Sequence, residues 1–267
     1  MCLFAGLSAR AGEVAEIPFE YRDGFLWLKV NVAEQGKPLN FVFDTGAASS
    51  VLDLGTARRL AVKLSGRVAV QGVHSRTTAR RVDRFSAKAA GIAMPESLIA
   101  VDLCAISKTC HCPIDGLIGA DFFRDRVVQI DFSVGKIRIL DKVESMSHCV
   151  VLPMKSQNGI FCVPVGIAGN PSRWMRVDTG CDSALEWALN RNAKEVNSGT
   201  SIGLTSARSR IISTDVRLGD HIVTGVKTGV HDRQMFPGEA GLVGNGLLSR
   251  FCVTIDVPGA RLLLESK

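Results

Sequence analysis

The sequence of 267 residues lacks several features that define common protein classes. No run approaches the ~20 apolar residues that a helix needs to cross a bilayer, which excludes an integral membrane protein of that kind. Its 32 Lys and Arg residues outnumber 26 Asp and Glu residues, but they are spread in short pairs rather than gathered in a stripe. This distribution is typical of a solvated surface and argues against a nucleic-acid partner.

Motifs of several enzyme classes are missing as well. No nucleophile-elbow motif accompanies the five histidines, so the sequence does not predict a serine hydrolase. The glycines at 241–246 do not follow the dinucleotide-binding pattern and have no alternating strand and helix around them. The Cys and His spacings between 104 and 112 differ from those of zinc sites. We therefore expect neither a metal nor a cofactor.

The residues that are present indicate a globular, mostly β protein. With 46% hydrophobic and 22% charged residues, the chain can bury a sizeable core, in one large domain or two modest ones. Short Val, Ile, Leu and Phe runs alternate with Gly, Pro, Ser and Asp turn signals, a pattern that predicts strands. Helices are expected to be a minority, and the clearest candidate is Ser183–Glu195, capped by Asp182 or Ser183, with a shorter equivalent around Thr56–Leu60.

The N-terminal residues 1–16 resemble the end of a signal peptide. An apolar stretch at residues 2–7 precedes Ala9-Arg10-Ala11, which has the small-x-small form of a cleavage site, although a basic leader is missing. We interpret residues 1–16 as a signal-peptide remnant and N-terminal arm, which predicts a periplasmic or secreted protein. The alternative is the frayed end of a cytoplasmic protein. The cysteine count favours export, because an oxidising compartment allows pairing: Cys2, Cys104, Cys110, Cys112, Cys149, Cys162, Cys181 and Cys252.

The chain repeats three sequence blocks in the same order. The triplet Asp-Thr-Gly occurs at 44–46, after the apolar Phe41-Val42-Phe43, and again at 178–180, after Trp174-Met175-Arg176-Val177. An alternating stretch that predicts a strand lies about 20 residues upstream of each triplet. A Gly-x-x-Gly block and two further strand patterns follow each one, beginning at Gly116 and at Gly241. We infer a duplicated unit, with lobes at 17–141 and 150–267 and a linker at 142–149.

These residues resemble the aspartic proteases. The pattern apolar-apolar-Asp-Thr-Gly-Ala at 42–47, followed by Leu117-Ile118-Gly119, is similar to that family, and 177–181 with Leu242-Val243-Gly244 resembles it again. The short spacing within each unit looks like a retropepsin-like protease of bacterial type, duplicated in one chain. The resemblance implies an all-β, bilobal acid-protease fold, with two β-barrel lobes related by pseudo-twofold symmetry. It also implies a monomer that acts as an intramolecular pseudo-dimer.

The chemistry of peptide hydrolysis explains why two triplets are needed. Two adjacent carboxyl groups can share one proton, so that one activates water while the other donates to the substrate carbonyl. The resemblance assigns these roles to Asp44 and Asp178, although the sequence does not show which is base and which is acid. We expect an aspartic endopeptidase that acts on a peptide or protein. The alternative is a catalytically weak or inactive peptide-binding module of the same fold.

The resemblance also assigns the neighbouring residues. Thr45 and Thr179 are expected to join the two loops through hydroxyl-to-backbone hydrogen bonds, and Gly46 and Gly180 to hold N–H groups near the carboxylates. Two hairpins are expected to close over the substrate as flaps, within 71–77 and 203–208. Their candidate residues are Gln71, Gly72, Val73 and His74 in the first, and Gly203, Leu204 and Thr205 in the second. The sole tyrosine, Tyr21, lies far from either flap, so the flap-tip tyrosine of pepsins is absent.

Several polar and sulfur-containing residues have simpler interpretations. The positions after the two triplets hold Ala47 and Cys181, and the latter is either a small buried filler or an oxidisable switch. The cysteines at 104–112 indicate a disulfide-pinned loop or a set of free thiols. Four further aspartates are expected to serve turns and strand ends, and the last two occupy matching positions: Asp115, Asp121, Asp131 and Asp256.

Overall fold

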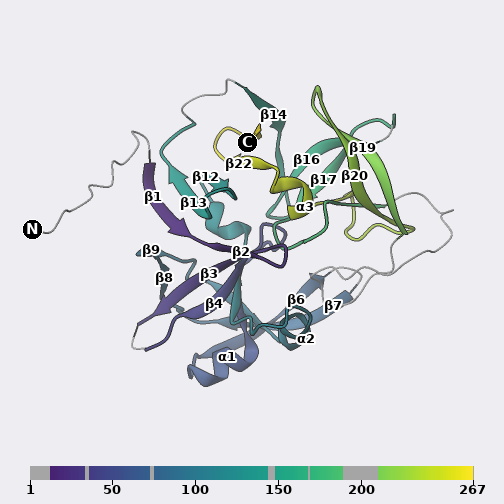
Figure 1. Ribbon diagram of the computed structural model, residues 1–267. Helices are drawn as coiled ribbons and strands as arrows, with labels where there is room; N and C mark the ends of the chain where they lie inside the picture. The colour runs from purple at the N-terminus through teal and green to yellow at the C-terminus, as the bar shows by residue number, and fades with distance from the viewer. Residues whose placement is uncertain are drawn as a thin grey trace, which may run out of the picture.

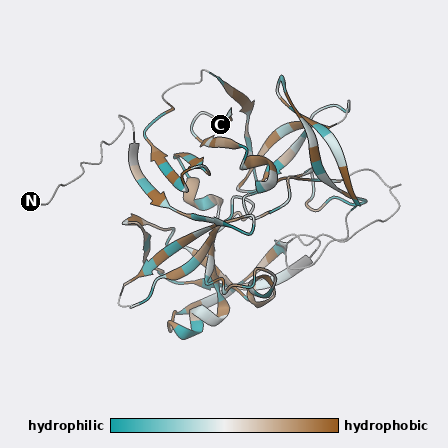
Figure 2. Cartoon of the chain, viewed as in Figure 1, coloured by the Kyte–Doolittle hydropathy of each residue, from teal (hydrophilic) through white to brown (hydrophobic). Residues whose placement is uncertain are grey.

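The protein is built mainly from β-strands. The computed structural model describes residues 13–33, 36–72, 75–143, 148–167, 169–188 and 210–266. These residues form three sheets and a few short helices (Figure 1), which confirms the predicted all-β class. Hydrophobic and hydrophilic residues alternate along many of the strands in Figure 2, as expected for strands with one buried face. Within the described segments, no helix has the length and apolar character required to cross a membrane.

The N-terminal sheet contains ten strands. Its central strands β4, β11 and β5 are short and buried, and they position the first Asp-Thr-Gly loop at the end of β4. Strand β2 (Glu20–Arg22) pairs with β3 beside the main path. The main order is β6 (Leu64–Gly72), β7 (Ser75–Val82), β10 (Leu98–Val101), β5 (Val51–Asp53), β11 (Gly116–Ile118), β4 (Leu39–Phe43), β3 (Phe25–Val32), β8 (Ala87–Ala89) and β9 (Ile92–Ala93).

The C-terminal sheet contains seven strands and repeats the central pairing. Strand β17 runs parallel to β21, and β21 runs antiparallel to β18, as β4, β11 and β5 do in the first sheet. The second Asp-Thr-Gly loop follows β17. The order is β15 (Lys155–Gln157), β16 (Ile160–Ile167), β17 (Arg173–Val177), β21 (Gly241–Val243), β18 (Leu185–Ala188), β20 (His221–His231) and β19 (Arg210–Leu218), with an additional β16–β19 pairing.

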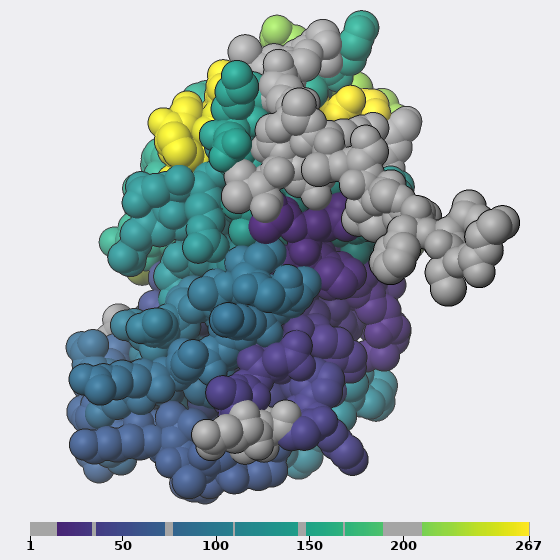
Figure 3. All heavy atoms as spheres, turned by 90° about the vertical axis from the view of Figure 1, so that its left-hand side faces the viewer, coloured from purple at the N-terminus to yellow at the C-terminus, as the bar shows by residue number. Residues whose placement is uncertain are grey.

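A third sheet of six strands joins the two halves of the chain. Strands β12 and β22 pair antiparallel at its centre, from Val127 opposite Asp256 to Asp131 opposite Cys252. The inward residues Val128 and Ile255 are fully buried, so this sheet forms part of a core common to both halves. Its order is β1 (Glu13–Pro18), β13 (Lys136–Leu140), β12 (Val127–Asp131), β22 (Phe251–Asp256), β23 (Arg261–Ser266) and β14 (Cys149–Pro153). In Figure 3 most residues of the first half fill the lower part of the molecule, and those of the second half fill the upper part.

The helices are short and lie between strands. Helix α1 (Leu54–Arg59) is capped by Asp53, whose side chain accepts a hydrogen bond from the Thr56 N–H, and this confirms the short helix predicted there. The sequence did not predict the others, which occupy four to six residues each and follow strands or tight loops: α2 (Cys104–Thr109), η1 (Ala120–Phe123) and α3 (Asn245–Leu248).

The predicted helix at Ser183–Glu195 is wrong where the structure describes it. Residues 185–188 form β18, which pairs in parallel with β20 and antiparallel with β21. All four residues of β18 are buried, so both faces of this strand are covered. Apolar spacing therefore could not separate a helix from a strand covered on both faces. The rest of the predicted helix, from residue 189, lies outside the described residues, as does most of the 1–16 arm.

The matching aspartates of the third sheet have matching structural roles, as predicted. Asp131 ends β12 and accepts hydrogen bonds from the N–H and hydroxyl of Ser133 and from Arg138. Asp256 ends β22 and accepts from the Gly259 N–H and from Arg261. Each carboxylate thus closes a hairpin turn and pairs with an arginine on the following strand.

Candidate active site

The two Asp-Thr-Gly loops meet between the N-terminal and C-terminal sheets. The Asp44 N–H donates to Ile118 O and the Asp178 N–H donates to Val243 O, each at 2.9 Å, so the neighbouring strand fixes both loops in the same way. The two carboxyl groups are hydrogen-bonded to each other. Their residues are 8% and 7% exposed, respectively. A largely dehydrated pair of carboxyl groups is therefore held in contact.

Each glycine of the triplets lies against the carboxyl group of the opposite loop. A Cβ atom added to Gly46 would lie 2.3 Å from Asp178 Cγ, and one added to Gly180 would lie 2.4 Å from Asp44 Cγ. The glycine N–H groups donate to the aspartate of their own loop, from Gly46 to Asp44 Oδ1 and from Gly180 to Asp178 Oδ1, both at 2.9 Å. The missing side chains thus provide the space in which the two carboxyl groups meet.

The two threonines join the loops through four buried hydrogen bonds. Thr45 Oγ1 donates to Val177 O at 2.7 Å and accepts from the Thr179 N–H at 3.0 Å. Thr179 Oγ1 donates to Phe43 O at 2.7 Å and accepts from the Thr45 N–H at 3.0 Å. Both residues have at most 1% exposure. These contacts form the hydroxyl-to-backbone lattice that the resemblance implied.

The environments of the two carboxyl groups differ. Burial raises the pKa of Asp44, but hydrogen bonds from Asp178, Gly46 and Ala47 and the charge of Arg176 oppose that rise. Burial raises the pKa of Asp178 well above its ordinary value, and the adjacent charge of Asp44 raises it further. The Ala47 N–H reaches Asp44 Oδ1 at 3.1 Å, in addition to the bond from Gly46. Asp178 therefore retains a proton more readily than Asp44 does.

A buried ion pair beside the two aspartates was not predicted from the sequence. The guanidinium of Arg176 binds Glu239 through two hydrogen bonds of 2.7 Å, and its Nη1 donates to Gly46 O at 2.7 Å. Their side chains are 8% and 4% exposed. The sequence signal for this ion pair was Arg176 itself, which lies two positions before Asp178, where the first repeat has Val42.

A buried asparagine supports the second loop. Asn245 Nδ2 donates to Gly24 O and to Thr179 O, both at 2.7 Å, which ties the start of α3 to the dyad loop and to the N-terminal sheet. The preceding block, Leu242 to Gly244, is buried beneath the loop, as is Leu117 to Gly119 in the first half. These blocks are structural supports, as the resemblance implied. Asn245 is a supporting residue that sequence reasoning missed.

A cavity of about 490 Å³ opens beside the two aspartates. The predicted flap residues Gln71 and Gly72 line it from the end of β6, in a hairpin with β7. Val73 and His74 lie outside the described residues, as do Gly203, Leu204 and Thr205 of the second predicted flap. The wall from the N-terminal half, formed by sheet strands and helix α2, is mainly apolar: Val51, Ile99, Val101, Leu103, Ile106 and Leu117.

Cys181 is a buried residue of a small apolar cluster. It is 1% exposed and packs with Met235, Phe236 and Leu242. Burial raises the pKa of its thiol well above the ordinary value, and the nearby charge of Asp178 adds to this effect. Both properties favour the filler interpretation over the oxidisable switch.

Alkylation should distinguish the two interpretations of Cys181. When native protein is treated briefly with iodoacetamide, we expect exposed Cys104 to react on the order of 100-fold faster than Cys181 and Cys162. The thiolate is the nucleophile, and burial keeps the thiols of Cys181 and Cys162 protonated. Burial raises the pKa of Cys162 to about 11. Peptide mass spectrometry with and without urea measures the difference. Labelling of Cys181 at the rate of Cys104 in native protein would instead support the switch.

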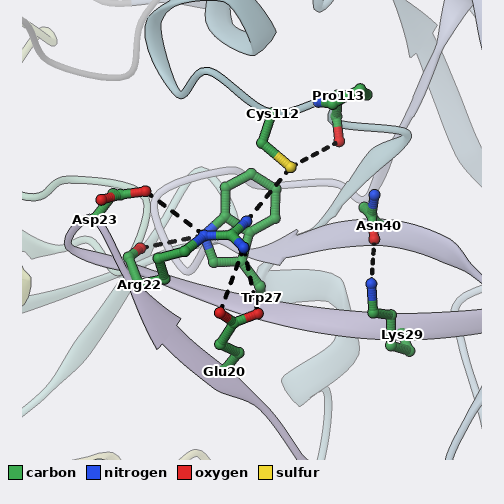
Figure 4. Close-up of polar contacts among 8 residues, drawn as sticks. All are labelled: Glu20, Arg22, Asp23, Trp27, Lys29, Asn40, Cys112 and Pro113. Carbon is green, nitrogen blue, oxygen red and sulfur yellow. Dashed lines mark hydrogen bonds and ion pairs between the residues drawn. The ribbon is translucent and has the colours of Figure 1, made fainter.

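The cysteines at 104–112 are free thiols, so the expected disulfide-pinned loop is wrong. Cys104, Cys110 and Cys112 each lack a disulfide partner. Figure 4 shows how the loop is held instead: Arg22 lies over the Trp27 ring and points toward Cys112, with Nη2 3.4 Å from Sγ. Among the described residues, no cluster of three or more His, Cys, Asp or Glu could hold a metal ion. With these thiols free, the cysteine count no longer supports export.

Comparison with known proteins agrees with this geometry. Residues 28–122 match the family described as "Aspartyl protease". A segment of 128 residues is 24% identical to the "Retrovirus-related Pol polyprotein from transposon 412" of Drosophila melanogaster. That segment covers 48% of this chain and 10% of the relative, so the chain spans a small part of the relative's length. Residues 28–122 are thus similar to the aspartyl proteases, and the all-β fold agrees with the retropepsin-like resemblance.

Proposed function

We propose that the chain is an aspartic endopeptidase in which Asp44 and Asp178 activate one water molecule. The observation that carries this proposal is the hydrogen-bonded pair of buried carboxyl groups at the edge of a cavity. Two carboxyl groups this close cannot both ionise readily, so they share one proton. Such a pair supplies the base and the acid that amide hydrolysis needs.

Asp44 is the base and Asp178 the acid in this proposal. Asp44 accepts two backbone N–H bonds in addition to the bond with Asp178, and these stabilise its ionised form. Its carboxylate takes a proton from water while the water oxygen bonds to the substrate carbonyl carbon. Asp178 donates its proton to the carbonyl oxygen, giving a neutral tetrahedral intermediate. Asp44 then gives its proton to the amide nitrogen while Asp178 takes a proton from a hydroxyl of the intermediate, so the C–N bond breaks and amine and carboxylic acid are released.

The substrate is a peptide segment in extended form. The β6–β7 hairpin ends at the cavity, so its backbone can add strand-like hydrogen bonds to such a segment and exclude water from the carboxyl pair. We assign the same role to the second predicted flap within 203–208. The mainly apolar wall of the N-terminal half is suited to a hydrophobic side chain.

One chain supplies both halves of the site. Four hydrogen bonds between Thr45, Thr179 and the opposite backbone link residues more than 130 positions apart, and both halves contribute strands to the third sheet. These contacts support a duplicated unit with lobes at 17–141 and 150–267, a linker at 142–149, and a monomer that acts as an intramolecular pseudo-dimer. Periplasmic or secreted localisation remains a proposal that rests on the 1–16 segment.

Cleavage of a diverse peptide library by purified protein, read by mass spectrometry from about pH 3 to 7, tests the proposal. We expect cuts by the wild type and a loss of at least ~1,000-fold in both Asp44→Asn and Asp178→Asn, because each variant removes a carboxyl group of the shared pair. The peptide-binding alternative predicts no cuts by the wild type and nearly unchanged binding in both variants. Cleavage that persists in either variant would contradict the dyad.

A further inference from the structure

The C-terminal half of the site carries charge where the N-terminal half is apolar. Strand pairing makes Arg176 the equivalent of Val42, because Arg176 is paired with Leu242 as Val42 is paired with Leu117. Glu239 lies three positions before Leu242, as Ile114 does before Leu117. Val42 and Ile114 belong to one apolar cluster. The C-terminal half therefore holds an ion pair where the N-terminal half holds two apolar residues of one cluster.

This ion pair is not needed to fill the position. A buried ion pair gains little net stability over a hydrophobic pair of similar volume, because removing both charges from water costs several kcal/mol. The N-terminal half folds with the hydrophobic pair at the same place. The placement of the charge relative to the two aspartates is therefore the feature to explain.

The Arg176 guanidinium is fixed on three sides. Glu239 binds two of its nitrogens, Gly46 O accepts from the third, and the Phe236 ring lies 3.4 Å from its Cζ. Gly46 is the residue whose N–H donates to Asp44 and whose Cα faces the Asp178 carboxyl group. Arg176 thus holds, from the opposite half of the molecule, the peptide unit between Gly46 and Ala47, whose Ala47 N–H donates to Asp44.

The charged groups around the dyad are few. Of the described residues that line the cavity, Arg176 is the one cation, and Glu239 is the one anion besides the dyad. The lining residues of the N-terminal half other than Asp44 carry no charge. The Cys181 thiol of the second loop lies near Asp182 and Glu186. The buried Glu186 carboxyl group is hydrogen-bonded to His231 at 2.5 Å. The positive charge of Arg176 acts on both dyad carboxyl groups.

We propose that Arg176, held by Glu239, is a positioning residue for the Asp44–Asp178 dyad. Arg176 fixes the Gly46 carbonyl, and it supplies the buried positive charge that favours the singly ionised carboxyl pair. Glu239 sets the strength of this effect, because its negative charge partly cancels that of Arg176. The proposal rests on the proposed function for its catalytic meaning, but the electrostatic effect is measurable without turnover.

Carboxyl carbon NMR of protein labelled in aspartate reports the dyad ionisation directly. In Arg176→Met, we expect the midpoint for forming the singly ionised pair to rise by about 1 pH unit, because an attractive charge is lost. In Glu239→Gln, the same midpoint should fall, because Arg176 is then uncompensated. A structural role alone does not predict opposite shifts in two variants that break the same ion pair.

Two further variants separate folding and positioning from charge. Arg176→Val/Glu239→Ile copies the N-terminal half, avoids an unpaired buried charge, and should raise the midpoint with the fold intact. Arg176→Lys keeps the charge but not the fork of hydrogen bonds, so the midpoint should stay near that of the wild type while kcat falls on the order of 10-fold. The proposal would be overturned if the midpoint shifted in the same direction in Arg176→Met and Glu239→Gln, or if it shifted in neither variant. Opposite shifts in a protein that cleaves no peptide would support it and refute the protease function instead.

Discussion

Replacement of Gly46 or Gly180 by alanine should reduce peptide cleavage by at least ~100-fold, since a displacement of about 1 Å at reacting groups costs this much. The added methyl group would stand 2.3 to 2.4 Å from the carboxyl carbon of the opposite aspartate, well inside van der Waals contact. That carboxyl group cannot move freely, because it is buried and bonded to its own loop and to the other aspartate. Neither glycine has a positive φ, so the effect is one of space rather than backbone conformation.

Cleavage assays beside thermal unfolding test this expectation. Gly36→Ala is the matched control, because a Cβ atom there meets nothing within 4 Å, and it should retain both activity and stability. We expect both site variants to lose about 1–3 kcal/mol of stability from overpacking, which leaves most of the protein folded for the assay. Folded Gly46→Ala with wild-type cleavage would show that the two carboxyl groups need not meet for catalysis.

The features that the sequence predicted depend on local residues. The Asp-Thr-Gly triplets and their flanking strands carry their own patterns, so the two loops and most strands of 24–32, 116–140 and 241–264 could be placed without tertiary information. The family match to residues 28–122 agrees with the first of these units. Local consistency of this kind is expected where propensity, pattern and turn chemistry agree.

The features that the sequence did not predict depend on distant partners. Arg176 and Glu239 are 63 positions apart, and neither has a local pattern that announces a buried ion pair. Asn245 likewise gains its role from Gly24 O, 221 positions away. Strand β18 was assigned to a helix because burial on both faces removes the alternation that identifies a strand. Comparison of Val42 with Arg176 across the repeat was the one sequence signal for the ion pair.

Replacement of Thr45 by valine should lower the free energy of unfolding by about 2–6 kcal/mol, since two buried polar groups are left unpaired at a cost of about 1–3 kcal/mol each. Valine keeps the volume of threonine but removes the hydroxyl, so Val177 O loses its donor and the Thr179 N–H loses its acceptor. Both groups belong to the opposite half of the chain and are buried. The same reasoning applies to Thr179→Val, which leaves Phe43 O and the Thr45 N–H unpaired.

Urea denaturation of matched variants isolates the contribution of the hydroxyl. Thr45→Ser keeps the oxygen and removes a methyl group, so it should lose only about 1 kcal/mol, and valine at exposed Thr78 should change little. Because the lattice joins the two loops that present Asp44 and Asp178, folded Thr45→Val should also cleave more slowly, through a lower kcat. If Thr45→Val and Thr45→Ser are equally stable, packing rather than the cross-chain hydrogen bonds holds the loops together.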